Sequence, residues 1–101
     1  MIQISERQLK KKFKHAADFG ICGNYNSQTA PAFESAIKAH VMNPDVQEIA
    51  GSYRGQLVTH YFDSGTNLNV IMDTAGNFVS GWKLNSAQIQ AVTTTGKLGG
   101  R

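Results

Sequence analysis

The run VQEIAGSYRGQLVTHYFDSGTNLNVIMDTAGNFVSGWKL (residues 46–84) decides the fold of this 101-residue chain. Apolar and polar residues alternate along it, and three short polar or glycine-containing stretches interrupt it, which is typical of β-strands joined by tight turns. Short turns favour antiparallel neighbours, so the strands should form one antiparallel meander. We predict turns at residues 54–55, 63–67 and 73–77 and four strands at residues 46–53, 56–62, 68–72 and 78–84.

Helical patterns flank this run on both sides. Ser5 is a suitable N-cap for a first helix, whose apolar stripe is Leu9, Phe13 and Ala16. A second helix is predicted over residues 29–42, and a short last helix, capped by residue 85 or 86, should reach residue 92. The two ends of the chain, residues 1–5 and 93–101, are expected to fray. The predicted fold class is therefore α+β, with N-terminal helices packed on a four-stranded antiparallel sheet in a single domain, residues 1–101.

The composition is that of a globular domain and argues against disorder, with 41% hydrophobic and 17% charged residues. No apolar run approaches the roughly 20 residues that cross a bilayer, so we expect no membrane-spanning segment. The polar N-terminus predicts that this sequence carries no secretory signal. Cys22 is the only cysteine and the three histidines are far apart, so we expect no disulfide, no metal site and no cofactor.

Positive charge is concentrated in the run KKKFKH (residues 10–15). Residues 1–14 carry five basic groups and one acid, whereas residues 15–101 carry five basic groups and six acids. A local cationic patch on a nearly neutral body suits an acidic partner, and above all the phosphates of a nucleic acid. A solvated helix face is the alternative interpretation of the same residues.

His15 ends the basic run and is the leading candidate for chemistry. RNA carries its own nucleophile, the 2′-hydroxyl, so an enzyme that cuts it needs a group that moves protons and cations that stabilise the phosphorane. Lys11, Lys12 and Lys14 could supply that charge, and they would also lower the pKa of the histidine. On a regular helix Lys12 and His15 share a side, whereas Lys14 points elsewhere. An exposed histidine without a role is the alternative.

Ser80 and Trp82 lie two residues apart on the last predicted strand, so their side chains should face the same way. They could contact phosphate and stack on a base, or they could be a core tryptophan with a small neighbour. His60 and His40 are better explained as structural, the first as a half-buried hydrogen-bonded side chain and the second at a helix end. Further possible stacking or phosphate-binding residues, which no spacing singles out, are Tyr25, Tyr53, Arg54 and Tyr61.

Two segments, KFKHAADFG (residues 12–20) and FVSGWKL (residues 78–84), resemble the two functional segments of the colicin D nuclease domain family. Residues 53–61 and 65–70 are also similar to that family, so the resemblance runs from about residue 9 to residue 84. It is specific because a lysine–lysine–histidine segment and a distant Ser-Gly-Trp-Lys occur together.

The resemblance implies a barnase/EndoU/colicin/RelE-like ribonuclease fold and cleavage of tRNA in the anticodon loop without a metal. Attack by the 2′-hydroxyl would leave 2′,3′-cyclic phosphate and 5′-hydroxyl ends. By position, the family's catalytic and active-site residues fall on His15, Lys12, Lys14, Ser80 and Trp82. We further expect substrate contacts from Lys10, Lys11, Arg54 and Lys83.

The resemblance also implies partners and a route of delivery. Such domains form the C-terminal part of a larger secreted toxin, either a colicin or a contact-dependent growth inhibition protein, and act in the cytoplasm of the target cell. Each is neutralised by a cognate immunity protein, which we expect to be acidic, and we expect the domain itself to be a monomer. A non-catalytic RNA-binding module and an adaptor for acidic proteins are the alternatives that the residues leave open.

Overall fold

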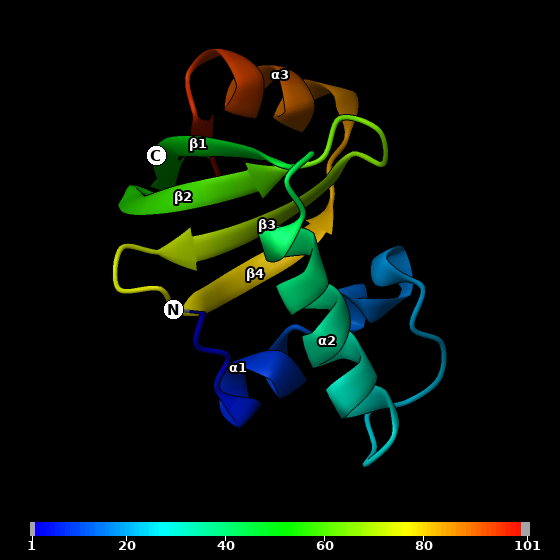
Figure 1. The fold of residues 1–101 in the computed structure, drawn as a ribbon. Helices are drawn as coiled ribbons and strands as arrows, with labels where there is room; N and C mark the ends of the chain where they lie inside the picture. The colour runs from blue at the N-terminus through cyan, green and yellow to red at the C-terminus, as the bar shows by residue number, and fades with distance from the viewer. Residues whose placement is uncertain (1, 100–101) are drawn as a thin grey trace.

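The computed structural model describes residues 2–99, which form a mixed sheet with helices on both of its faces (Figure 1). Three elements precede the sheet, and a further helix lies between its last two strands. In chain order the elements are α1 (Glu6–Lys11), the 3₁₀ helix η1 (Phe13–Phe19), α2 (Thr29–Met42), β1 (Gln47–Tyr53), β2 (Gln56–Phe62), β3 (Leu68–Asp73), β4 (Phe78–Lys83), α3 (Ser86–Thr94) and β5 (Lys97–Leu98).

The predicted α+β class and the antiparallel meander are confirmed, and one strand was missed. In the described residues the strand order is β4-β3-β2-β1-β5, with β1 to β4 paired antiparallel in sequence order. The additional strand, β5, pairs parallel to β1 through Ser52 and Tyr53. A sheet of five strands therefore replaces the expected four.

The sequence predicts that residues 1–5 and 93–101 fray, and in the described residues both ends make contacts with the rest of the fold. The helix α3 continues to Thr94, and Leu98 of β5 is buried, with only 4% of its surface exposed. At the other end, the backbone of Gln3 donates to Gly76 O and accepts from Phe78 N, both at 2.8 Å. Both ends make backbone hydrogen bonds with distant strands or turns, and such long-range contacts leave no local pattern in the sequence. Residues 1, 100 and 101 lie outside the described residues.

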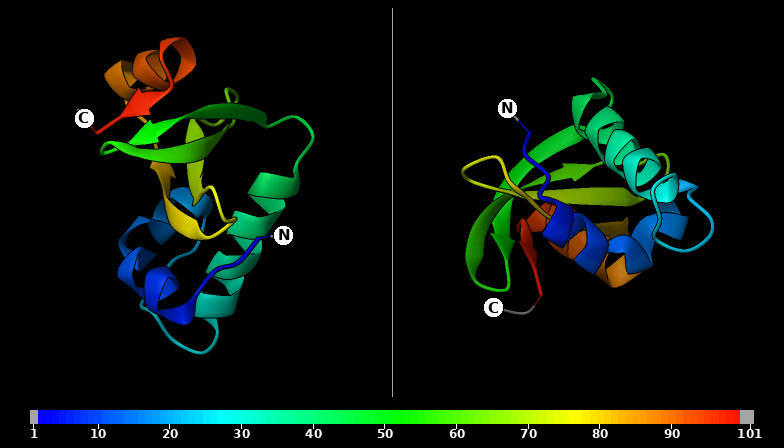
Figure 2. Two further views of the ribbon diagram at one scale, coloured as in Figure 1. Left: turned by 90° about the vertical axis from the view of Figure 1, so that its left-hand side faces the viewer. Right: turned by 90° about the horizontal axis from the view of Figure 1, so that it is seen from below.

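The sheet separates two apolar cores. The helices α1, η1 and α2 cover one face, where Leu9, Phe33 and Ile37 pack on Val70 and Met72 of β3. The helix α3 covers part of the other face (Figure 2). There the buried residues are Val58, Phe62, Ile71, Leu84, Val92 and Leu98. The apolar stripe predicted at residues 9–16 thus lies in or beside the first core.

Two backbone features fix the end of the sheet where β1, β2 and β5 meet. The hairpin β1–β2 turns through Arg54 and Gly55, which both have positive φ (53° and 82°), as a two-residue turn of the right twist requires. The strand β1 also lies very close to the segment that leads into β5, since a Cβ added to Gly51 would lie 2.0 Å from Gly96 O. Gly51 therefore allows the segment at Gly96 to approach β1 closely, so that β5 can pair with β1.

Candidate active site

A change of helix type arranges the basic run. The helix α1 is capped at its N-terminus by Ser5, as predicted, and ends at Lys11. Lys12 is the junction residue, with φ −98° and ψ 6°, and the 3₁₀ helix η1 follows it. Residues three apart are eclipsed in a 3₁₀ helix, and His15 N donates to Lys12 O at 3.0 Å. Lys12 and His15 therefore lie on one side, which is the side of β4.

His15 faces an aromatic surface made by two strands. Its ring lies 5.7 Å from the ring of Trp82, at an angle of 34°. Trp82 in turn lies 5.8 Å from the ring of Tyr53. Two strands separate β4 from β1 in the sheet, and neighbouring strands are about 4.8 Å apart, so a flat sheet would keep these two rings well separated. The sheet is curled (Figure 2), and this curl accounts for the short distance between the rings of Tyr53 and Trp82.

Cations from two parts of the chain gather around Lys12, whose own charge acts on His15. Partial burial lowers the pKa of Lys12, and the positive charges of Lys14, Lys11 and Arg54 lower it further. Arg54 belongs to the β1–β2 turn and also lies over the ring of Tyr53, with its guanidinium carbon 5.2 Å from the ring centroid. The structure thus brings Arg54 from the far hairpin to the basic run, and its contact with a substrate stays a prediction.

The electrostatics of this cluster favour a neutral imidazole. Partial burial lowers the pKa of His15 below its ordinary value of 6.5, Lys14 and Lys12 lower it further, and Asp18 partly opposes them. Lys14 is thus near enough for its charge to act on both Lys12 and His15, and its part in the reaction stays a prediction. A neutral imidazole can accept a proton near pH 7, while the adjacent ammonium groups can stabilise an anion.

Ser80 shares a sheet face with Trp82, as the spacing predicted, since they pair with the alternate residues Ile71 and Asn69 of β3. Ser80 is, however, buried, with 1% of its surface exposed, and its hydroxyl has no partner among the described residues. A contact between Ser80 and a substrate would need the side chains above it to move. Its role in phosphate or sugar binding stays a prediction.

The remaining predicted contact residues are distributed around the cluster. Lys11 acts electrostatically on Lys12, but the ammonium of Lys10 lies on the other side, 5.8 Å from the ring centroid of Tyr25. Lys83 is exposed, and its backbone amide donates to the carboxylate of Asp18 at 3.0 Å. This bond ties η1 to the edge strand β4.

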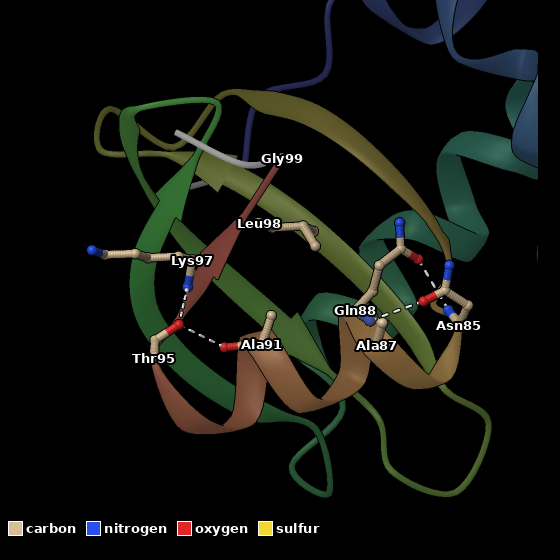
Figure 3. A pocket seen from close by; sticks show the side chains of 8 residues that line it. All are labelled: Asn85, Ala87, Gln88, Ala91, Thr95, Lys97, Leu98 and Gly99. Atoms are coloured by element: carbon tan, nitrogen blue, oxygen red, sulfur yellow. Dashed lines mark hydrogen bonds between the residues drawn. The ribbon is translucent and has the colours of Figure 1, made fainter.

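Gln88 is a residue of this site that the sequence analysis did not select. Its side-chain oxygen accepts from Trp82 Nε1 at 3.3 Å and from the backbone amide of Asn85 at 3.0 Å. Asn85 Oδ1 accepts from Gln88 N in return, so the two residues form a capping box at the start of α3 (Figure 3). The spacing Asn85-x-x-Gln88 is a known cap signal, but only the fold shows that the same glutamine holds the indole.

The other two histidines make hydrogen bonds that join parts of the fold, and His60 is more buried than the half-buried position expected for it. His60 is fully buried, and its Nε2 donates to Gly96 O at 2.9 Å and to Ser52 O at 3.2 Å, while its Nδ1 accepts from Asn69 Nδ2 at 3.1 Å. His40 Nε2 donates to Tyr61 O at 2.7 Å and so joins α2 to β2. Within residues 2–99 no three histidine, cysteine or acidic side chains lie close enough to hold a metal ion.

Fold and site together define a class: a small α+β domain with a histidine and a cluster of cations at the edge of a curled sheet. A family model described as Colicin D matches residues 8–92, and the chain belongs to this family. It is 41% identical over 85 residues to Colicin-D of Escherichia coli, across 82% of this chain but only 12% of that much longer protein. Its structure is also similar, with a TM-score of 0.79 and 38% identity, to a ribonuclease from Escherichia coli that was solved in complex with its inhibitor protein. That comparison covers 90% of this chain and all of the ribonuclease chain.

Within the described residues no helix combines the length and the apolar character that crossing a membrane requires.

Proposed function

We propose that this chain is a toxic endoribonuclease domain that cleaves tRNA in the anticodon loop without a metal ion. The observation that carries the proposal is the cluster itself, in which a histidine with a lowered pKa lies between lysines and an aromatic face. Membership of the colicin D family and the similarity to a ribonuclease support the reaction class. The anticodon loop as target comes from the resemblance described above.

The chemistry divides among the residues according to their positions. Neutral His15 accepts the proton of the 2′-hydroxyl, whose oxygen attacks the adjacent phosphorus. As the bond from phosphorus to the 5′ oxygen breaks, the imidazolium returns a proton to that oxygen. The products are a 2′,3′-cyclic phosphate and a 5′-hydroxyl, so no water is consumed in this step. Lys12 and Lys14 stabilise the added charge on the phosphorane.

The other residues bind the RNA. Trp82 and Tyr53 offer an aromatic wall on which a base can stack, and Arg54 and Lys11 extend the cationic surface along the backbone. Lys10 and Lys83 lie further out and suit contacts with more distant phosphates. Ser80 contacts the phosphate or sugar only after the side chains above it have moved.

We also propose a neutralising partner. The basic run coincides with the site, so an acidic immunity protein that covers residues 10–15 would block access by RNA. Such a partner should associate fast and in a salt-dependent way. The similar ribonuclease was solved with an inhibitor protein, which supports this assignment. The test compares association rates of wild type and Lys12→Glu at low and high salt, and equal rates that do not depend on salt would place the inhibitor elsewhere.

Delivery follows from the family. The chain matches a small part of a long colicin, so we propose that it is the toxic portion of a larger secreted protein and acts, as a monomer, in the cytoplasm of the target cell.

The function is tested by incubating the domain with total tRNA in the presence of EDTA and separating the products on a denaturing gel. Discrete fragments with 2′,3′-cyclic phosphate ends are expected. A shift on a native gel without fragments would mean that the patch only binds RNA. No fragments and no shift would favour an adaptor for acidic proteins, and loss of cleavage on chelation would contradict the metal-free mechanism.

A further inference from the structure

A second pocket lies beside the candidate active site, on the other side of η1. It is bounded by η1 and by the segment that joins η1 to α2, and its volume is about 440 Å³. Phe13, Ala16 and Ile21 form an apolar floor, and Lys14, Cys22 and Tyr25 stand around it. Neither the reaction nor the aromatic wall at Trp82 uses this space.

The pocket combines an aromatic wall with positive charge. Phe13 and Tyr25 meet edge to face, with ring centroids 5.4 Å apart and an angle of 88°. The ammonium of Lys10 lies 5.8 Å from the centroid of Tyr25, and Lys14 is itself part of the wall. None of the described residues that line the pocket is acidic. A flat, apolar ring that carries a negative group is the ligand that such a surface favours.

The joining segment adds unused hydrogen-bond donors. The backbone amides of Cys22, Gly23 and Asn24 have no acceptor among the described residues, and the side-chain amide of Asn24 has none either. Within residues 2–99, Asn24 takes part in one hydrogen bond, which its carbonyl accepts from the hydroxyl of Thr29. The edge of a nucleobase presents acceptors that such donors can satisfy.

Lys14 connects this pocket to the site of cleavage. It lines the pocket, and its charge also lowers the pKa of both His15 and Lys12. One ammonium group is thus close to the proposed position of the cleaved phosphate and to the mouth of the pocket. A strand whose phosphates follow Lys14 would bring the neighbouring base over the apolar floor.

We propose that this pocket binds the base of a nucleotide that flanks the cleaved bond, so that the enzyme holds RNA on both sides of η1. The inference rests on the proposed ribonuclease function and adds to it a site that selects the substrate. The base would be held by Phe13 and Tyr25 and by the free amides of residues 22–24, while Lys14 and Lys10 bind the backbone.

Cys22 provides the experiment, since it is the only cysteine of the chain, is exposed and lines the pocket. The rate at which iodoacetamide alkylates Cys22 is measured in the His15→Ala variant, which is expected to bind RNA and to cut it about 10²–10⁴-fold more slowly than wild type. The probes are a single-stranded RNA oligonucleotide of mixed sequence and an inorganic polyphosphate of equal charge. The RNA should slow alkylation several-fold while the polyphosphate leaves it unchanged; equal protection by both, or by neither, would overturn the proposal.

A second measurement uses the active protein with Cys22 modified. A bulky phenylmaleimide adduct fills the pocket, whereas an S-methyl disulfide at the same sulfur leaves it open and serves as the matched control. The bulky adduct should raise KM for tRNA by about 5- to 150-fold, which is the loss of affinity expected when one base can no longer stack, and it should change kcat little. Circular dichroism confirms that both adducts are folded.

The results separate this inference from the proposed function. If tRNA is cut but the bulky adduct has no effect and RNA does not protect Cys22, the pocket is not a base site and the ribonuclease function stands. If RNA protects Cys22 but nothing is cut, the pocket binds RNA and the ribonuclease function fails.

Discussion

Gln88 links the stability of α3 to the position of the only tryptophan, so its removal should weaken both. Its side-chain oxygen accepts two hydrogen bonds, from Trp82 Nε1 at 3.3 Å and from the amide of Asn85 at 3.0 Å. A hydrogen bond contributes about 0.5–1.5 kcal/mol net, and the longer of the two belongs at the lower end. We therefore expect Gln88→Ala to lower the free energy of unfolding by about 1–2 kcal/mol.

The matched control is Gln90→Ala, because Gln90 is an exposed glutamine on the same helix whose side chain makes no hydrogen bond with any residue that the structure describes. This control should change the unfolding free energy by less than about 0.5 kcal/mol. Urea unfolding followed by far-ultraviolet circular dichroism measures both without relying on the tryptophan signal. Equal stability of the two variants would refute the assignment of these hydrogen bonds.

The same variants test whether Gln88 positions the indole. Without its acceptor, Trp82 should become more mobile, which lowers its fluorescence anisotropy and the rate of tRNA cleavage. Gln88→Glu should restore much of both, since a carboxylate oxygen accepts the same two bonds. A variant that loses stability but keeps wild-type anisotropy and cleavage would limit Gln88 to a role in the cap.

Three further outcomes follow from the structure. Leu98→Ala should cost about 2–5 kcal/mol of unfolding free energy, while the exposed neighbour Lys97→Ala is nearly neutral, and equal effects in urea unfolding would mean that β5 is not part of the core. Lys14→Met removes a charge that lowers the pKa of His15, so the acid limb of the pH–rate profile should move to higher pH, whereas Lys10→Met should leave it in place. Burial lowers the pKa of His60 below 6.5, so the unfolded chain takes up this proton at a higher pH than the folded chain does. The free energy of unfolding should therefore be highest above about pH 6.5 and should fall as the pH decreases from there. A urea midpoint that is constant or rises toward about pH 5 would contradict this.

The elements with local signals were predictable. The turn at Arg54 and Gly55 and the turn at Asp73, whose carboxylate accepts from the amides of Ala75 and Asn77, are encoded by residues next to one another. The cap of α1 at Ser5 is of the same kind. These signals place the strands and helices because they depend on short stretches of chain.

The missed features depend on distant parts of the chain. The strand β5 has two residues, too few for a periodic pattern, and it exists because Gly51 lets the segment at Gly96 approach and because Gly96 O accepts from both Ser52 N and His60 Nε2. A sequence pattern cannot show such a long-range contact.

The same holds for the geometry of the site. The spacing of Lys12 and His15 suggested that they share a side, and the resemblance added Trp82. The curl of the sheet that brings Tyr53 and Arg54 to them has no local signature, because it arises from the packing of whole strands. Nor does the change from α1 to η1 at Lys12 coincide with a glycine or a proline.

The central claim is that His15 moves the protons in metal-free cleavage of RNA. The most direct measurement compares wild type and His15→Ala on total tRNA in EDTA, with circular dichroism as the control for folding and analysis of the fragment ends. Wild type should give discrete fragments with 2′,3′-cyclic phosphate and 5′-hydroxyl ends, and His15→Ala should be slower by about 10²–10⁴-fold while it remains folded. A folded His15→Ala variant that cuts at the wild-type rate, or fragments that carry 5′-phosphates, would contradict the account.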